Sequence, residues 1–500
     1  MRYLELTGMI LTVILILWLL LFKNKGKLFI FPVVMNTVLL AAHLIFEKPR
    51  WQMGIVYFFA LILLEYVLWA NIRGKEIRIN KVLKGVLTGV AVLLIVVMVL
   101  PPVLLPVPQL PGVTGSYAIG ATTFHMRDES RPEIYTEADD CRELMVTVWY
   151  PADKENGTNP KSYISGIEAL GEAIRDGLGV PAFMAGYLNL VRSGAAVEAP
   201  VSSRSDAYPL LIFSHGLGVP AGFYTSIIRE LTSRGYIVAA IEHAYGNAAT
   251  TFPDGRVADF RNDPDSMDDE ALAEMETVWA GDMSFVIDRM AAMNDGDGSD
   301  MFVGRIDMAR VGTIGHSFGG GAAYMSLLAD VRVRAAINLD GSVYGIDPIF
   351  PVESKRFMLI TSDDYAAALR DAEGKLLSYG ELGEKEKAEL MSEGIGEKEY
   401  TEKMGQMIRA MEYLRNELDR DSLFIRLEGT KHYNFSDFPL LSPLVRSMGL
   451  TGSMDGKRGL EIVNRLCAAF FGECLGNEEG VVDRCIREYS EIHVESLRWK

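Results

Sequence analysis

The feature that most constrains this chain is a series of long apolar stretches at its N-terminal end. They lie at about 4–22, 28–46, 52–70 and 83–105. Each is long enough to cross the hydrocarbon layer of a bilayer, which takes roughly 20 helical residues. No small-residue cleavage site follows the first stretch and further apolar stretches do, so it reads as an anchor and not as a removable signal peptide. The sequence therefore predicts about four transmembrane helices.

Basic residues in the connections between these stretches predict which way the helices cross the membrane. Most lie in two connections, after the first and third stretches: Lys23, Lys25, Lys27, Arg73, Lys75, Arg78, Lys81 and Lys84. Because loops rich in Lys and Arg stay in the cytoplasm, these two connections are expected inside and both chain termini outside. We therefore predict a multi-pass protein of the cell membrane whose large C-terminal part is extracytoplasmic.

The distribution of charge divides the chain at the same place. Residues 1–105 carry 11 Lys and Arg against 4 Asp and Glu, whereas the rest carries 38 against 62. So acidic a domain would repel the phosphates of nucleic acid, and no nucleic-acid partner is expected. The proline-rich run PPVLLPVPQLPG favours an extended spacer because proline cannot continue a helix. We predict a transmembrane region over 1–105, a linker over 106–115 and a second domain over 116–500.

The cysteines are few and scattered. Cys141, Cys467, Cys474 and Cys485 show neither the spacing of a metal site nor that of a disulfide framework. We expect free buried thiols, with a single disulfide as the alternative.

Short apolar runs rich in β-branched residues recur along the second domain. They lie at Leu144–Tyr150, Leu210–Phe213, Ile237–Ile241, Val311–Ile314, Ala335–Leu339, Phe357–Ile360 and Leu423–Leu427. Helical patterns lie between them, for example at Tyr224–Ser233, Glu270–Met293 and Gly320–Leu328. Strands alternating with helices indicate an α/β fold with a mainly parallel sheet covered on both faces. Such sheets bind ligands at the carboxyl ends of their strands, so polar residues just after a strand are the candidates for a site.

A charged helical insertion at about 366–420 interrupts this alternation. Its apolar residues recur at helical spacing and include Met404, Met407 and Met411. Such a stripe is typical of the core face of a helix. The alternative is a cap over the active site, in which adaptable methionine side chains touch an acyl chain.

A Gly-x-Ser-x-Gly motif centred on Ser317 follows one of the predicted strands. A glycine-rich chain of this length can contain such a match by chance, so its surroundings decide. The strand Val311–Ile314 precedes it and a run of small residues opens a helix after it, which is the context of a hydrolase nucleophile elbow. We therefore predict that Ser317 is a nucleophile on a tight turn, where Gly315 and Gly319 leave room for the chain to pack closely.

A serine nucleophile needs a base, and the base needs an acid that orients it. In α/β-hydrolases the chain order is serine, acid, histidine. Only His432 and His493 lie late enough, and His432 stands in a loop just after a predicted strand, whereas His493 lies in a charged tail. His432 is therefore the predicted base. The acid stays open between Asp340 and Asp363, since each follows a predicted strand.

The oxyanion of such a reaction needs two amide donors. One is the amide after the nucleophile, here Phe318, and the other comes from an earlier strand–loop junction. The segment FSHGLG ends a strand with a turn formed by His215 and Gly216, which makes Leu217 the expected second donor. This chemistry needs neither a metal nor an organic cofactor, and none is predicted.

Five motifs in this order resemble the platelet-activating factor acetylhydrolase family: FSHGLG, GYIVAAIEH, GHSFGG, NLDG and KHYNFSDF. The segment DDCRELMVTVWYPA also looks like the opening strand of that family. The resemblance runs from about Gly112 to about Pro443 and implies an α/β-hydrolase fold with phospholipase A2-type esterase activity on short or oxidised acyl chains. The four leading spans and the helical insertion depart from the animal enzymes of the family.

The resemblance also implies a role for each matching residue. Ser317 matches the nucleophile, Asp340 the acid and His432 the base, while Leu217 and Phe318 match the oxyanion donors. It therefore implies Asp340 over Asp363, a choice that position in the chain leaves open.

We thus expect a membrane-anchored serine esterase or lipase, whose substrate is a lipid or a small amphiphilic ester. Alternatives on the same fold are a general carboxylesterase, a polyester or dienelactone-type hydrolase, and an acyltransferase that passes the acyl group to an alcohol. A membrane sensor without enzyme activity is a further alternative, which the complete set of catalytic residues disfavours.

Overall fold

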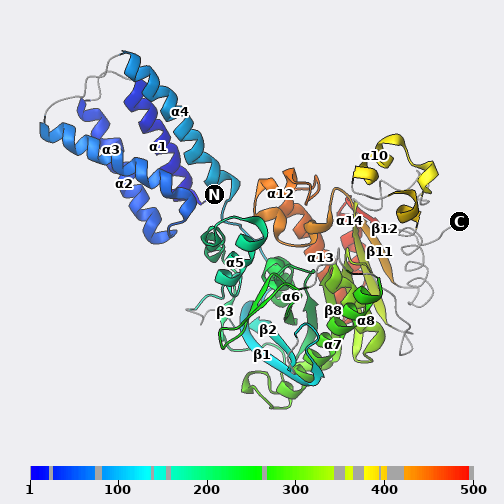
Figure 1. Ribbon diagram of the computed structural model, residues 1–500. Helices are drawn as coiled ribbons and strands as arrows, with labels where there is room; N and C mark the ends of the chain where they lie inside the picture. The colour runs from blue at the N-terminus through cyan, green and yellow to red at the C-terminus, as the bar shows by residue number, and fades with distance from the viewer. Residues whose placement is uncertain are drawn as a thin grey trace. The chain divides into compact units, whose positions relative to one another are not determined.

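The computed structural model describes residues 2–494, except 22–25, 74–80, 137–139, 154–158, 262–266, 268, 343–354, 364–376, 393–395 and 402–421. The chain divides into two compact units (Figure 1). The first is Met1–Pro108 with the short segments Gly186–Val191 and Leu441–Leu444, and the second is the remainder.

The first unit packs four helices together: α1 (Tyr3–Leu21), α2 (Gly26–Phe46), α3 (Gly54–Arg73) and α4 (Lys81–Leu104). Apolar side chains cover its outside as well as its interior; Leu28, Phe31 and Ile72, for example, are exposed. A helix that is apolar all round is expected where lipid and not water surrounds it. Among the described residues, three stretches are long and apolar enough to span a membrane: Tyr3–Leu21, Leu28–Phe46 and Trp51–Ile72. The apolar part of α4, Thr88–Leu104, is shorter, so the fourth span stays a prediction.

One cluster of charges lies inside this unit. Arg50 pairs with the buried carboxylate of Glu5, and His43 Nδ1 lies 2.9 Å from a carboxylate oxygen of Glu47. Ligand atoms of Glu5, His43 and Glu47 lie within 4.8 Å of one another, a spacing that a metal ion could bridge. The arginines Arg2 and Arg50 already neutralise the Glu5 carboxylate, however, so the cluster is one of paired charges and we propose no cation site there.

The second unit is built on a mixed sheet that has ten strands within the described parts of the chain, in the order β12-β11-β10-β9-β8-β4-β5-β2-β1-β3. Its central strands run parallel: β5 (Ile237–His243), β4 (Tyr208–Ser214), β8 (Ile306–His316), β9 (Val333–Leu339), β10 (Arg356–Ser362) and β11 (Leu423–Leu427). Antiparallel neighbours flank them: β2 (Cys141–Ala152) beside β5 and β12 (Ile492–Val494) beside β11. Beyond β2 lie β1 (Ala118–Pro132) and β3 (Ala196–Val197). Each of the predicted strands lies within one of these, and the predicted mainly parallel α/β sheet is confirmed.

Burial explains why these segments were readable as strands. Every residue of β4 is buried, as expected of a central parallel strand covered on both faces, and its sequence is a continuous apolar run. β2 lies farther from the centre and its burial alternates along most of its length. An alternating strand of this kind has one face against the core and one face less covered.

Helices cover both faces of the sheet. α6 (Thr225–Ser233) and α13 (Gly456–Cys474) pack against each other on one face, and α7 (Asp269–Asn294) packs against α8 (Phe318–Ala329) on the other (Figure 1). The core face of α7 carries large side chains at helical spacing, including Met275, Trp279 and Met283. The first turn of α8 is glycine-rich, which lets it approach the strands closely.

Several elements did not appear among the strands and helices expected from the sequence. They include β1, β3, α5 (Ile167–Leu178), α13, α14 (Val481–Glu488) and β12. His493, which the sequence places in a charged tail, lies inside the short strand β12, and its Nε2 lies 2.9 Å from a Glu428 carboxylate oxygen. Of the insertion at 366–420, the structure describes only 377–392 and 396–401, which include α10 (Glu384–Ser392); its methionine stripe lies outside the described residues. All four cysteines are free thiols, and Cys467 and Cys485 are buried.

Candidate active site

The carboxyl edge of the parallel strands gathers the residues predicted from the sequence. Ser317 follows β8 directly, and Asp340 follows β9. His432 begins a short 3-10 helix, η7 (His432–Phe435), in the loop after β11. Because parallel strands end at the same edge of a sheet, residues far apart in the chain meet there.

Ser317 occupies a backbone conformation that side chains rarely adopt. Its φ is 55° and its ψ is −127°, directly before the first residue of α8. Such a conformation is strained in any residue other than glycine and persists only where the surroundings enforce it. The surroundings here are tight: a Cβ on Gly315 would lie 2.0 Å from the Gly319 carbonyl oxygen, and a Cβ on Gly319 would lie 2.3 Å from the His215 carbonyl oxygen. The two glycines are therefore a steric requirement of this turn.

A chain of hydrogen bonds links Ser317, His432 and Asp340. His432 Nε2 lies 2.8 Å from Ser317 Oγ, and His432 Nδ1 lies 2.8 Å from Asp340 Oδ2. Because the carboxylate can only accept, Nδ1 carries the proton and Nε2 is left to accept the serine hydroxyl. The His432 side chain is 41% exposed, so a substrate can reach it from solvent.

Asp340 is held in place by more than its histidine. Its other carboxylate oxygen accepts the Ser362 amide at 2.6 Å. Burial alone would raise the pKa of Asp340, but the hydrogen bond and charge of His432 and the Ser362 amide outweigh it and hold the pKa below its usual value. The carboxylate therefore stays ionised at neutral pH, as an orienting group for an imidazole must.

Asp363, the alternative acid, is engaged elsewhere. Its carboxylate pairs with Arg426 on β11 and accepts the Gly429 amide at 3.2 Å. Of the two aspartates left open by chain position, Asp340 is the one that reaches His432.

The turn after β4 presents a row of amides. The Gly216 amide donates to the Tyr224 hydroxyl at 3.0 Å, and the Gly218 amide donates to the Gly246 carbonyl at 2.9 Å. Between them, the Leu217 amide has no hydrogen-bond partner among the described residues. Phe318 is the first residue of α8, where N–H groups point out of the helix along its axis. The two amides predicted as oxyanion donors thus belong to elements that end at the same edge as Ser317.

A second group of polar residues is linked to this turn through His215, and most of its members were not predicted from the sequence. Ser214 Oγ lies 2.9 Å from His243 Nε2, and His243 Nδ1 lies 2.8 Å from Asp282 Oδ2 on α7. Trp279 stacks on the His243 ring with centroids 3.9 Å apart. His215 joins this group, since its Nε2 accepts the His243 amide at 3.1 Å and its Nδ1 donates to the Gly216 carbonyl at 2.8 Å.

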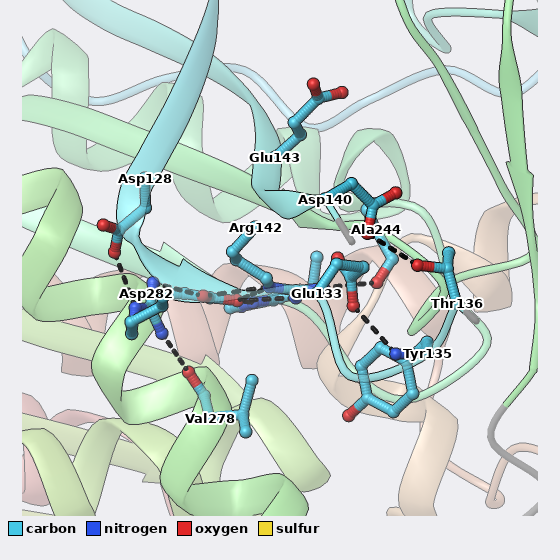
Figure 2. A network of polar contacts seen from close by, with 12 residues as sticks. Asp128, Glu133, Tyr135, Thr136, Asp140, Arg142, Glu143, Ala244, Val278 and Asp282 are labelled. Carbon is cyan, nitrogen blue, oxygen red and sulfur yellow. Dashed lines mark hydrogen bonds and ion pairs between the residues drawn. The ribbon is translucent and has the colours of Figure 1, made fainter. Parts of the chain in front are cut away.

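Charges in this buried group are balanced by arginines (Figure 2). Arg142 Nη2 lies 2.7 Å from Asp282, and its Nη1 lies 2.9 Å from Glu133 and 3.1 Å from the Ala244 carbonyl. Burial would raise the pKa of Asp282, but Arg142 and His243 outweigh it and hold the pKa far below its usual value. Burial lowers the pKa of His243 despite the nearby carboxylate. The group therefore consists of a neutral His243 that is hydrogen-bonded to the charged ion pair of Asp282 and Arg142.

One sequence signal could have revealed this ion pair. Arg142 stands in phase with Leu144, Val146 and Val148, all of which face the core, because side chains alternate along a strand. An arginine in phase with core residues needs a buried counter-ion. The sequence does not say which acid supplies it, since Asp282 lies 140 residues away.

Comparison with known proteins identifies relatives of the second unit. A family model described as platelet-activating factor acetylhydrolase, isoform II, matches residues 105–277 and 268–484. A platelet-activating factor acetylhydrolase from Cavia porcellus is 23% identical over 393 residues, which cover 73% of this chain and 78% of that protein. One from Gallus gallus is 24% identical over 401 residues, covering 72% and 82%.

Similarity extends to other esterases. A probable 1-alkyl-2-acetylglycerophosphocholine esterase from Arthroderma benhamiae is 25% identical over 245 residues, or 47% of this chain and 59% of that protein. Among solved structures, a ferulic acid esterase from Streptomyces cinnamoneus matches with a TM-score of 0.59 and 25% identity, covering 78% of this chain and all of that one.

Proposed function

We propose a mechanism and a substrate class from one premise: this chain belongs to the platelet-activating factor acetylhydrolase, isoform II, family and is an ester-hydrolysing enzyme. In the proposed mechanism Ser317 is the nucleophile, His432 the general base and Asp340 the acid that orients His432. The observation that carries it is the hydrogen-bond chain through these three residues, which starts from a serine held at a positive φ.

The first half-reaction acylates the serine. Ser317 Oγ attacks the ester carbonyl carbon while its proton passes to His432 Nε2. The negative charge that develops on the carbonyl oxygen is bound by the Leu217 and Phe318 amides. The tetrahedral intermediate then breaks its bond to the alcohol oxygen, which takes the proton from His432 and leaves.

The second half-reaction restores the enzyme. A water molecule attacks the acyl–serine carbonyl and gives its proton to His432 Nε2. Collapse of the second tetrahedral intermediate breaks the bond to Ser317 Oγ, which recovers the proton as the carboxylic acid departs. Throughout, the Asp340 carboxylate stabilises the positive charge that His432 acquires, and its low pKa keeps the proton on the imidazole.

The proposed substrate is a short-chain or oxidised acyl phospholipid, or a related amphiphilic ester. Two observations support it: relatives are named for platelet-activating factor and for 1-alkyl-2-acetylglycerophosphocholine, and the chain carries three helices long enough to span a membrane. A membrane anchor would hold the active site near amphiphilic substrates. A general carboxylesterase is the second candidate, supported by the similarity to a ferulic acid esterase.

A substrate panel separates these two candidates. The full-length protein in detergent micelles would be given phosphatidylcholines with an acetyl or a long-chain acyl group at the second position, together with an aryl ester. The proposal predicts the highest kcat/KM for the acetyl phospholipid, with all activity lost in Ser317→Ala. Equal rates on all three esters would support the general carboxylesterase instead.

We also propose that the second unit is extracytoplasmic, as the basic connections of the first unit suggest. Lys23, Lys25, Lys75 and Arg78, which carry much of that argument, lie outside the described residues. Protease added to intact cells should then digest the second unit, whereas protease added to inverted membrane vesicles should leave it whole. The opposite pattern would reverse the orientation.

A further inference from the structure

His316, the residue before the proposed nucleophile, has both ring nitrogens engaged. Nε2 lies 2.9 Å from the His432 carbonyl oxygen, and Nδ1 lies 2.8 Å from the Tyr224 hydroxyl. A carbonyl oxygen can only accept, so Nε2 carries the proton and donates it. In a neutral imidazole Nδ1 is then the acceptor, and the Tyr224 hydroxyl is its donor.

Tyr224 continues this chain to the turn after β4. Its hydroxyl oxygen accepts the Gly216 amide at 3.0 Å while its proton goes to His316. The structure thus joins the Gly216 main chain to the His432 main chain through three consecutive hydrogen bonds. Tyr224 is 0% exposed and His316 is 1% exposed, so no bulk water can replace a lost partner, and each loss leaves a buried polar group unsatisfied.

The charge of His316 fits this arrangement. Burial, together with the neighbouring His432, lowers the pKa of His316 to about 3. The ring therefore stays neutral at mildly acidic and neutral pH and keeps one donor and one acceptor nitrogen. Neutrality also matters because the ring centroids of His316 and His432 lie only 4.6 Å apart, and a charged His316 would oppose the charge that forms on the base.

We propose that His316 and Tyr224 are positioning residues. They fix the turn after β4 (His215–Gly218, here called the oxyanion turn) and the catalytic base relative to each other. This inference rests on the proposed function, in which Leu217 donates to the oxyanion and His432 transfers the proton. Tyr224 engages the Gly216 amide and so leaves the next amide, that of Leu217, as the donor of the turn. His316 fixes the peptide of His432 itself. A misplacement of about 1 Å in either group is enough to cost on the order of 100-fold in rate.

The first test removes the tyrosine hydroxyl. Tyr224→Phe should lower kcat by about 10- to 100-fold and leave KM within about twofold, because substrate binding does not use the chain. The matched control is Tyr208→Phe, which removes another buried hydroxyl, one that donates to the Ser202 carbonyl at 3.0 Å. This control should lose stability without losing kcat. Titration of active sites with a fluorophosphonate corrects kcat for any unfolded fraction.

The second test asks whether the two residues act as one unit. In His316→Gln the side-chain amide can occupy the place of Nε2 and still donate to the His432 carbonyl, so it should retain more activity than His316→Leu. The double variant Tyr224→Phe/His316→Leu should be no slower than the worse single variant by more than about threefold. If the two losses multiply, or if Gln and Leu are equally slow, the residues do not form a chain.

The inference and the proposed function fail in different ways. Activity that persists in Ser317→Ala would overturn the proposed function. An inactive Ser317→Ala alongside a Tyr224→Phe enzyme with wild-type kcat would overturn the positioning role alone. If Tyr224→Phe does not fold, His316→Gln against His316→Leu still decides, because wild-type kcat in both would contradict the inference.

Discussion

The described part of the second unit contains two Ser–His–Asp chains of hydrogen bonds, and their distances are nearly identical. Ser317–His432–Asp340 has steps of 2.8 and 2.8 Å, and Ser214–His243–Asp282 has steps of 2.9 and 2.8 Å. Their surroundings differ. Ser317 sits at a positive φ beside a histidine that is 41% exposed. Ser214 is instead the last residue of the regular strand β4, and its group is fully buried.

Hydrogen-bond distances alone therefore do not tell a catalytic triad from a structural one. Substrate must be able to reach a catalytic serine, and amide donors must lie close to the substrate oxygen that becomes the oxyanion. A serine in a fully buried strand does not meet these conditions. The acids differ as well: Asp340 accepts from His432 and one amide, whereas Asp282 is also paired with Arg142 and Arg131. We therefore interpret Ser214–His243–Asp282 as a structural group and call it the buried triad. Its hydrogen bonds join α7 to the ends of β4 and β5.

The largest expected effect separates the two aspartates left open by the sequence. Asp340→Asn should lower kcat about 10⁴-fold with little change in stability, because the amide stabilises the wrong tautomer of His432. Asp363→Asn, which breaks only the contacts with Arg426 and Gly429, should retain kcat within about threefold. Steady-state kinetics on an aryl ester measures both. Loss of turnover in the second variant alone would assign the acid to Asp363.

The buried triad should respond in the opposite way. Asp282→Asn should destabilise the second unit by about 3–5 kcal/mol, because it leaves the Arg142 guanidinium in the core without its main counter-ion. The fraction that remains folded should still turn over substrate. Urea unfolding and active-site titration measure the two quantities separately. A stable but inactive variant would mean that the buried triad takes part in the chemistry.

A smaller effect is expected in the pH dependence of stability. Two fully buried aspartates, Asp437 and Asp282, have pKa values shifted in opposite directions. Burial raises the pKa of Asp437 to about 7, despite bonds from Tyr163 and the Ser226 amide, whereas arginines hold the pKa of Asp282 low. The folded protein thus keeps a proton on Asp437 that the unfolded chain releases near pH 4. The stability that this group contributes is fully present below about pH 4 and is lost as the pH rises through about 7.

Urea unfolding between pH 4.5 and 8 tests that sign. Asp437→Asn should gain stability relative to the wild type as the pH rises, because it removes the cost of ionising a buried group. Asp282→Asn should show a constant loss over the same range, since Asp282 is ionised in both states there. A constant difference for Asp437→Asn would show that its carboxyl titrates normally.

The two triads also show how far the sequence alone reaches. The exposed one was predictable because each member follows a strand and the elbow needs small residues at Gly315 and Gly319, which are local patterns. Local sequence did not decide which aspartate is the acid, because Asp340 and Asp363 both follow strands. The resemblance to a family favoured Asp340. The buried triad escaped prediction because Asp282 lies inside a helix with no local mark of its role. Its partner Arg142 does carry a local mark, because it stands in phase with the core residues of β2 and so needs a buried counter-ion. That mark cannot identify Asp282 as the counter-ion, since the contact spans 140 residues.

The strands, too, divide into those with a local sequence pattern and those that depend on tertiary pairing. The central strands were readable because burial on both faces makes them continuous apolar runs, as in β4. The three-residue strand β12 has too short a pattern to identify; it forms by pairing with the edge of β11. Tertiary pairing of this kind is absent from local sequence.

The most direct test of the central claim is labelling by a fluorophosphonate probe, which modifies an activated serine covalently. The full-length protein, Ser317→Ala and Ser214→Ala would be labelled in detergent, with folding of each checked by thermal unfolding. We predict that the wild type and Ser214→Ala label and that Ser317→Ala does not. Labelling that survives in folded Ser317→Ala but disappears in folded Ser214→Ala would contradict the account and make the buried triad the reactive one.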